Sequence, residues 1–202
     1  MSAGVHGGSL GRWFEELCRL KHEKLRAVVS RSGSNYRMHS NQVPKSGGVY
    51  VFWWTGPISS LRAATFNRKL NLHGPGGRTV PIEVDDEWLG LDAGLPVPLY
   101  VGKNAGNLSS RIGQHLLLGT PTRIFPGSIG AQRHKPPTTS CQLRAGVEHH
   151  FLTETAPLNL ILENIGLSYV SLDGDANAAN RFYLEDLAIG LMRPPFNIDI
   201  ER

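Results

Sequence analysis

The sequence is poor in cysteine and has no long apolar run, and both absences limit the kind of protein it encodes. Cys18 and Cys141 are its only cysteines, and neither has a partner at metal-ligand spacing, so we expect two reduced thiols. The longest purely apolar run, Val49 to Trp54, has six residues, whereas a membrane-spanning helix needs about 20. Charges interrupt every apolar cluster near the N-terminus, which argues against a signal peptide. We therefore expect a cytoplasmic protein without a membrane span.

Acidic residues are missing from one long stretch of the chain. Residues 148–202 hold nine acids against three bases, but residues 99–147 hold no acid and six bases: Lys103, Arg111, Arg123, Arg133, Lys135 and Arg144. The net charge of +4 is too small to imply nucleic-acid binding by itself. The basic middle segment nevertheless suits a surface that faces phosphates.

The length and composition predict one main domain with additions. A chain of 202 residues that is 40% hydrophobic can bury a sizeable core. We divide it into an N-terminal helical arm (1–44) and a main domain (45–202) with two inserted features. One is an insertion over residues 55–98, with a helix at 61–70, a Gly-Pro turn at 74–77 and a short strand at 80–84. The other is a basic loop over residues 120–147, rich in Pro, Gly, Ser and Thr.

The N-terminal arm has helical periodicity and a basic bias. Apolar residues recur at helical spacing from Leu10 to Val28, which predicts one amphipathic helix ending near residues 30–33. From Arg19 to Lys45 there are seven basic residues against the single acid Glu23. Two interpretations stay open: a solvated face of a packing helix, and an arm that contacts DNA.

The strongest strand signal is Val49–Trp54, which follows Gly47-Gly48. Side chains alternate across a strand, so Tyr50, Phe52 and Trp54 should share one face. Taken alone, Tyr50 in this pattern is typical of a packed core tyrosine.

The segment from Pro98 to His115 predicts a strand, a turn and a helix. Arg111 and His115 are four residues apart and should share a helix face, close to Lys103 and to the Tyr100 hydroxyl at the strand end. Three candidate cations and a phenol at one place suit an anionic ligand, and phosphate is the obvious candidate. The alternative is an ordinary strand-turn-helix unit with solvated charges.

The C-terminal third predicts a short helix at 158–165, a strand at 167–172 and a long helix from Ala178 to about Met192. Glu185 interrupts an apolar stripe on the long helix, formed by Phe182, Ile189 and Met192. A carboxylate there must be paired, protonated or metal-bound, because an isolated buried charge is costly. Helix geometry alone favours an ion pair with Arg181.

Taken together, these fragments resemble the GIY-YIG nuclease family over about residues 45–202. The matching elements, in the family's order, are Gly48-Val49-Tyr50, Tyr100-Val101-Gly102, Asn107-Leu108 with Arg111, His115, Glu185, and Asn197 twelve residues after Glu185. The resemblance implies an α/β (α+β) fold, with a small mixed or antiparallel three-stranded sheet flanked by helices.

The resemblance also implies a chemistry: hydrolysis of a DNA phosphodiester with one divalent cation, Mg²⁺ or Mn²⁺, and no organic cofactor. It implies the catalytic set Tyr50, Tyr100, Lys103, Arg111, His115, Glu185 and Asn197. Glu185 would be the metal ligand, and Arg111 would bind a phosphate oxygen. Tyr50 is the leading candidate for activating water, with nearby cations favouring its phenolate, and Tyr100 is the alternative.

Within the family, the small size favours a restriction-type endonuclease acting on double-stranded DNA, because little chain remains for a separate recognition domain. The resemblance to that class implies a homodimer, so that both strands are cut. The candidate DNA-binding residues are Arg62, Arg68, Lys69, Arg123, Arg133, Lys135 and Arg144. One alternative is a structure-specific repair or mobile-element nuclease. Another is a GIY-YIG-like DNA-binding module that has lost catalysis.

Overall fold

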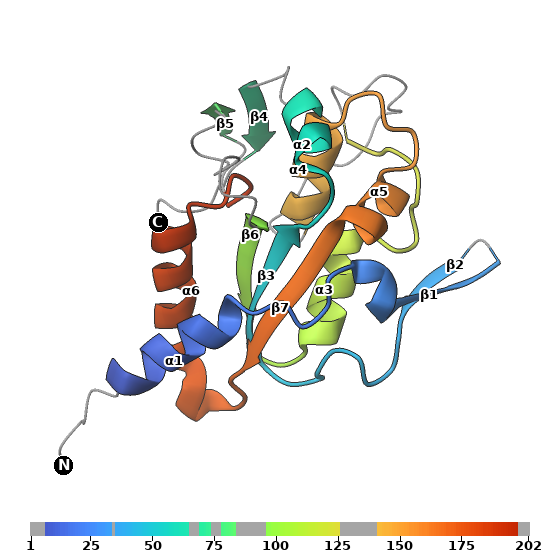
Figure 1. Cartoon of the computed structure of the whole chain (residues 1–202). Helices are drawn as coiled ribbons and strands as arrows, with labels where there is room; N and C mark the ends of the chain where they lie inside the picture. The colour runs from blue at the N-terminus through green and yellow to red at the C-terminus, as the bar shows by residue number, and fades with distance from the viewer. Residues whose placement is uncertain are drawn as a thin grey trace, which may run out of the picture.

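The fold is built around a three-stranded antiparallel sheet (Figure 1). The computed structural model describes residues 7–33, 35–64, 69–73, 78–83, 96–125 and 141–197. The central strand β3 (Gly48–Trp54) pairs with β6 (Val97–Asn104) on one side and with β7 (Ile165–Ser171) on the other. The predicted mixed fold with a small antiparallel sheet is therefore confirmed, as are the three predicted strands.

The central strand is buried on both faces, and its side chains alternate as predicted. Tyr50, Phe52 and Trp54 belong to one hydrophobic cluster, whereas Val49 and Trp53 belong to another. All seven residues of β3 are buried, which explains why the strand reads as a continuous apolar run.

Helices cover both faces of the sheet. The Tyr50 face packs against α3 (Leu108–Leu116), α4 (Gln142–His150) and α5 (Pro157–Asn164). The opposite face packs against α1 (Gly7–Leu17) and α6 (Ala178–Met192), through buried side chains that include Leu17, Leu184 and Ala188. The short 3₁₀ segment η4 (Asp175–Asn177) leads into α6. No helix among the described residues is long and apolar enough to span a membrane.

The predicted bounds of α6 are correct, and its predicted apolar stripe is confirmed in part, because Ile189 and Met192 are partly buried and pack against the core. Leu184 and Ala188 are buried, whereas the Phe182 side chain is 49% exposed. Asn177 stands at the N-cap position without a side-chain cap; its Oδ1 accepts a hydrogen bond from Nδ2 of Asn180 at 2.9 Å. Arg193 ends the helix in the left-handed conformation before two prolines that cannot continue it.

The N-terminal region differs from the predicted single helix. Helix α1 ends at Leu17, and the later apolar residues enter the core through the 3₁₀ turn η1 (Leu25–Val28). A two-stranded antiparallel ribbon follows, made of β1 (Val29–Ser32) and β2 (Asn35–Met38). Leu17, Leu25 and Val28 are all fully buried, so this region is part of the main core rather than a separate arm.

The predicted insertion and basic loop are partly regular structure. The insertion contains α2 (Ile58–Ala64) and an antiparallel pair, β4 (Lys69–His73) and β5 (Thr79–Glu83). The predicted helix over 61–70 is therefore wrong at Lys69 and Leu70, which belong to a strand. The predicted loop over 120–147 is wrong from Gln142 onward, because α4 begins there.

Candidate active site

The predicted site residues gather at the outer edge of β6, where the two faces of the sheet meet. Tyr50 and Tyr100 lie on the same face of the sheet, and α3 places Arg111 and His115 over that face. Lys103 is the register partner of Val49 and therefore points to the α6 face, where it meets Glu185. Six side chains from β3, β6, α3 and α6 thus converge, although 135 positions separate the first from the last.

Gly102 makes this convergence sterically possible. It lies opposite Tyr50 in the β3–β6 register, so no side chain separates the Tyr50 ring from the edge of the sheet. A Cβ atom at residue 102 would lie 2.5 Å from the Tyr50 hydroxyl oxygen and 2.8 Å from Cε1 of Tyr100. Glycine is required here because both phenols pack over this backbone.

Tyr50, Tyr100 and His115 form a compact aromatic group. The Tyr50 hydroxyl lies 2.7 Å from His115 Nε2, and the rings of Tyr100 and His115 are 4.7 Å apart. Burial lowers the pKa of His115 well below 6.5, and the nearby Arg111 charge adds to this effect. His115 is therefore a neutral imidazole at neutral pH. Its Nδ1 has no hydrogen-bond partner among the described residues.

The Tyr50 hydroxyl is not preset as a phenolate. Burial, followed by the negative influence of Tyr100, raises the pKa of Tyr50 well above 10, and Arg111 opposes only part of this rise. Arg111 alone therefore does not bring Tyr50 into the range of a base at neutral pH. Arg111 favours the phenolate, as predicted, but desolvation outweighs the guanidinium.

Arg111 has the surroundings of an anion-binding group. Burial works to lower its pKa, but the hydroxyls of Tyr50 and Tyr100 outweigh that effect and raise the pKa of Arg111 above its usual range. Its buried Nε has no hydrogen-bond partner among the described residues. A half-buried guanidinium with an unused donor suits a phosphate oxygen. Asn107 fixes the start of the helix that carries Arg111, since its Oδ1 accepts a hydrogen bond from the Ser110 N–H at 2.9 Å.

Glu185 and Lys103 form an ion pair at the edge of the site. Their side chains are 14% and 34% exposed, so the carboxylate is the more enclosed partner. The alternative pair with Arg181 is not formed: Nη1 of Arg181 donates instead to the backbone carbonyls of Leu172 and Gly174, at 2.6 and 2.8 Å. Sequence reasoning missed the neighbouring Phe182, whose ring centroid lies 5.1 Å from Lys103 Nζ. Its position one helical turn before Glu185 was the available signal.

Asn197 has a positioning contact with the backbone of β6. Its Nδ2 donates to the Val101 carbonyl at 2.7 Å, and its Oδ1 accepts from the Val101 N–H at 2.8 Å. The Phe196 N–H also donates to the Leu99 carbonyl at 3.1 Å. Residues 196 and 197 therefore cover part of the free edge of β6. Asn197 fixes the strand that carries Tyr100 and Lys103, and both ends of its amide are occupied in doing so.

Two of the predicted DNA-binding arginines are structural. Arg144 is fully buried, and its Nε donates to the Glu148 carboxylate at 2.7 Å. Its other nitrogens donate to the backbone carbonyls of Leu116, Thr120, Pro121 and Thr122. Arg123 donates to the carbonyls of Phe151, Glu154 and Glu148. The prediction that Arg144 binds DNA is therefore wrong, because its charge satisfies free carbonyls beyond the end of α3.

The other predicted DNA contacts are less constrained by the structure. Arg62 is exposed on α2. Lys69 begins β4, but the described part of the structure does not extend to its side chain. Arg68, Arg133 and Lys135 lie outside the described residues.

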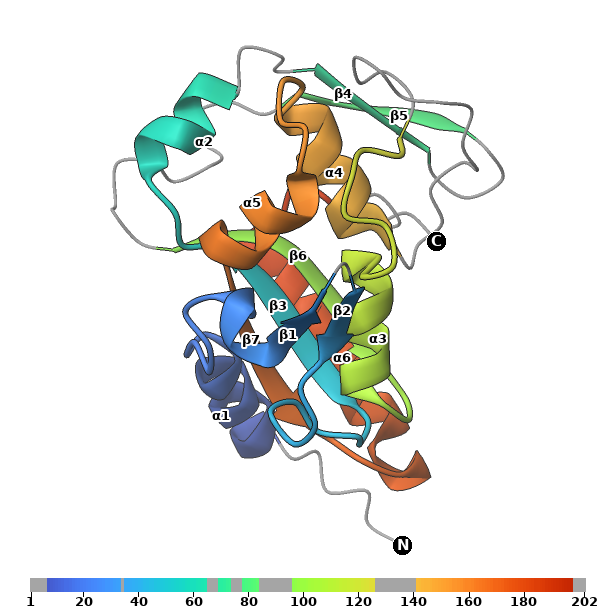
Figure 2. The same ribbon diagram turned by 90° about the vertical axis from the view of Figure 1, so that its right-hand side faces the viewer.

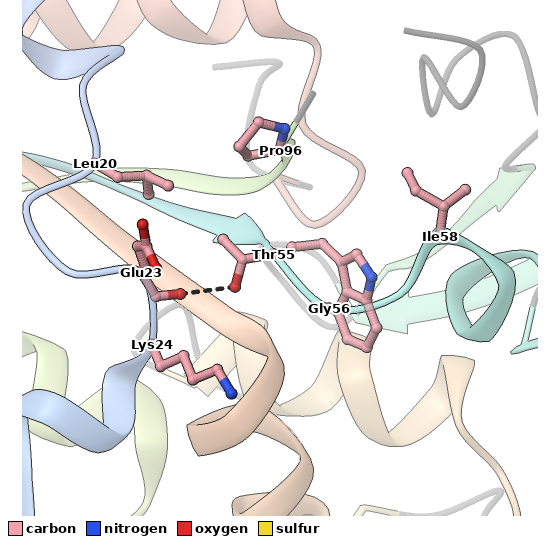
Figure 3. A pocket seen from close by; sticks show the side chains of 8 residues that line it. Leu20, Glu23, Lys24, Thr55, Gly56, Ile58 and Pro96 are labelled. Carbon is pink, nitrogen blue, oxygen red and sulfur yellow. Dashed lines mark hydrogen bonds between the residues drawn. The ribbon is translucent and has the colours of Figure 1, made fainter. Parts of the chain in front are cut away.

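A pocket of about 260 Å³ lies at the far end of β3 from Tyr50 (Figure 3). Leu20, Glu23, Lys24, Trp54, Thr55, Gly56, Ile58 and Pro96 line it. The Thr55 hydroxyl donates to the Glu23 carbonyl at 2.7 Å beside it. None of the predicted catalytic residues lines this pocket, so it is separate from the site at the β6 edge.

The donor set at the β6 edge fits a divalent cation only if other ligands complete the coordination. No group of three or more His, Cys, Asp and Glu side chains is arranged to hold a metal within the described ranges. Glu185 is a single enclosed carboxylate, which suits Mg²⁺ because this ion keeps several waters and takes phosphate oxygens as ligands. A comparison of the chain with known proteins finds no matching family model, no matching curated protein and no matching solved structure.

Proposed function

We propose that this chain is a GIY-YIG-type DNA endonuclease that hydrolyses phosphodiester bonds with one divalent cation, and that it acts as a homodimeric restriction-type enzyme. The observation that carries the proposal is the convergence of two phenols, a guanidinium, a neutral imidazole, a lysine and a carboxylate at one edge of β6. A binding module would need the cations but not the hydrogen-bonded Tyr50–His115 pair. The set suits phosphate hydrolysis because it supplies a proton route and an anion site together.

In the proposed reaction, Tyr50 transfers a proton rather than acting as a free phenolate. Water attacks phosphorus as it gives a proton to the Tyr50 oxygen, and the Tyr50 hydroxyl proton passes to His115 Nε2, 2.7 Å away. His115 can accept this proton because its imidazole is neutral, which leaves a lone pair on Nε2 beside the Tyr50 hydroxyl. The ester bond to the leaving oxygen breaks, and that oxygen takes a proton from solvent.

Charge on the attacked phosphate is balanced by residues on both sides of the site. Arg111 would hold a non-bridging oxygen through its unused Nε, and this contact strengthens as charge develops in the transition state. Glu185 would hold the divalent cation, which when bound offsets charge on the phosphate and on the leaving oxygen. Tyr100 packs beside Tyr50 and His115 and restricts the orientation of both rings.

The proposal is tested by plasmid cleavage in Mg²⁺ with the full chain and with Glu185→Gln. Asp186→Asn is the matched control, because Asp186 is the adjacent carboxylate on α6 and is exposed to solvent. We expect the wild type and Asp186→Asn to cut DNA, and Glu185→Gln to lose at least 100-fold in rate. Binding of DNA without Mg²⁺-dependent cleavage by the wild type would contradict the proposal and favour the inactive module.

The cleavage products distinguish the restriction-type activity from the alternative nuclease activity. Discrete fragments from a plasmid indicate a sequence-specific enzyme. A preference for branched or flapped duplexes over the intact plasmid would instead indicate a structure-specific repair or mobile-element nuclease. Mapping the cut ends by sequencing would then define the site.

A further inference from the structure

The β1–β2 ribbon projects from the body of the protein on the side of α3 that faces away from α6 (Figure 1). Figure 2 shows the same ribbon beside α3 from another direction. Gly33, at the turn, has a φ of 61°. An isolated two-stranded ribbon is only marginally stable in water, so its retention on the surface calls for a reason.

The ribbon is fastened to the core at its base. Tyr36 is 8% exposed, and its hydroxyl donates to Asn159 Oδ1 of α5 at 3.0 Å. Met38 packs against Gly113 of α3, where a Cβ would lie 3.4 Å from Met38 Cγ. These contacts fix the direction of the ribbon while leaving its outer face in solvent.

The outer face of the ribbon is entirely polar. Side chains that oppose each other across the ribbon share a face, so Ser30, Ser32, Asn35 and Arg37 lie on the face away from the buried Tyr36. The Arg37 side chain is exposed and makes no hydrogen bond or ion pair with any described residue. On the other face, Arg31 lies over the Tyr36 ring at 5.6 Å, and its Nε donates to the Gly33 carbonyl at 2.9 Å.

The segment that contains the ribbon has no acidic residue, although Glu163 of α5 pairs with Lys24 and Arg26 beside it. The sequence from Lys24 to Ile82 contains no Asp or Glu, so the ribbon and its flanks carry no acidic side chain of their own. Such a surface also attracts acidic proteins. Its shape, however, is a narrow ribbon of arginine, asparagine and serine side chains. These side chains hydrogen-bond to base edges, and a two-stranded ribbon fits the major groove of DNA.

The ribbon is also close enough to the candidate active site to share one duplex. Helix α3 contacts β2 on one side and carries Arg111 and His115 on the other. The two surfaces are thus separated by about one helix diameter, roughly 10 Å, which is less than the major-groove width of about 12 Å. A duplex with a phosphate at Arg111 can present its adjacent groove to the ribbon.

We infer that the β1–β2 ribbon enters the major groove of the DNA substrate, with Arg37 and Asn35 contacting base edges and Arg31 contacting phosphate. This inference rests on the proposed nuclease function and adds a recognition element that precedes the nuclease signatures in the chain. On this inference the ribbon reads the DNA sequence, and the buried Arg144 does not.

The experiment measures binding of a fluorescent duplex of about 30 base pairs that contains the mapped cut site, in EDTA and at several salt concentrations. We expect Arg37→Ala to weaken binding about 5- to 50-fold, and Arg31→Ala to reduce the salt slope by about one. Arg19→Ala is the matched control, because it removes an exposed arginine near the end of α1 and should change affinity less than twofold. Thermal unfolding of each variant checks that the fold is retained.

A duplex whose cytosines carry glucosylated hydroxymethyl groups tests whether the ribbon binds in the major groove, because the sugars fill that groove. Loss of binding to this duplex, with binding retained in netropsin, supports the inference. Wild-type affinity of Arg37→Ala, or full binding to the glucosylated duplex, would overturn it. If the wild type cleaves plasmid while the ribbon variants bind normally, the inference fails and the nuclease proposal stands. If the wild type binds no duplex, both fail.

Discussion

The Tyr50 hydroxyl and His115 Nε2 are 2.7 Å apart in a part of the site from which solvent is excluded. Both groups have pKa values displaced toward their neutral forms, Tyr50 upward and His115 downward, and burial is the main cause for each. The pair is therefore arranged to move one proton in a concerted step, not to hold separate charges at rest.

Replacing either member of this pair should remove most of the activity. We expect Tyr50→Phe and His115→Gln each to lower kcat by about 10²- to 10⁴-fold, which is the usual contribution of a positioned acid or base. The double variant should be no slower than the worse single variant, because both act in one step. Single-turnover cleavage in Mg²⁺ measures this.

Tyr169→Phe is the control for the tyrosine change, because it also removes a hydrogen-bonded hydroxyl, from a partly buried ring on β7 that belongs neither to the site nor to the ribbon. It should keep cleavage within a few-fold of the wild type. If the effects of Tyr50→Phe and His115→Gln multiplied in the double variant, the two residues would act in separate steps.

The Arg144–Glu148 pair should contribute to stability and not to DNA affinity. Arg144→Met leaves the Glu148 carboxylate buried without its cation, and breaking such a pair costs about 3–5 kcal/mol. Glu148 also accepts the N–H groups of Ile124 and Phe125, so Glu148→Gln should preserve part of that role. The double variant, Arg144→Met with Glu148→Gln, should therefore recover part of the loss in urea unfolding. A variant that stayed stable but bound DNA weakly would restore Arg144 as a DNA ligand.

These two pairs show what the sequence can and cannot predict. The alternation of side chains around Tyr50 in β3 and the bounds of α6 were predictable, because strand alternation and helix-stop signals act over a few residues. The partner of Lys103 is 82 positions away on α6, and Arg144 binds carbonyls more than 20 positions upstream. No local pattern contains such pairings. The run of basic residues therefore predicted a DNA contact at Arg144, although tertiary packing buries the charge of this residue.

The β1–β2 ribbon was missed for a related reason. Its strands, Val-Ser-Arg-Ser and Asn-Tyr-Arg-Met, have four residues each and little apolar alternation. The preceding apolar residues continued the helical spacing of α1 past Leu17, although Leu25 and Val28 reach the core through a 3₁₀ turn. Packing against α3 and α5, rather than local propensity, holds the ribbon in place.

His150 should make the protein less stable as the pH falls. Burial lowers the pKa of His150 from 6.5 to about 4, and the nearby backbone of Leu61 opposes only part of that shift. Between about pH 6.5 and 4 the unfolded chain binds a proton at this residue but the folded chain does not. The free energy of unfolding should therefore decrease by up to about 3 kcal/mol across this window, and remain constant above it for this residue.

His150→Leu isolates this contribution, because it keeps an apolar side chain in the buried position without a titrating group. The difference in unfolding free energy between wild type and variant should change with pH between 6.5 and 4. His115 shifts in the same direction and remains in both proteins, so it cancels in the comparison. A difference that is independent of pH would show that His150 titrates normally in the folded protein.

Lys103 should compete with a divalent cation for Glu185. The ammonium forms an ion pair with the one enclosed carboxylate of the site, so a cation that binds Glu185 must displace it. Lys103→Met should therefore bind Mn²⁺ several-fold more tightly than the wild type, as measured by electron paramagnetic resonance of free Mn²⁺. Lys21→Met is the matched control, because it breaks the Lys21–Glu16 pair away from the site and should leave Mn²⁺ affinity unchanged. Weaker Mn²⁺ binding by Lys103→Met would mean that the lysine positions the carboxylate for the cation instead of competing with it.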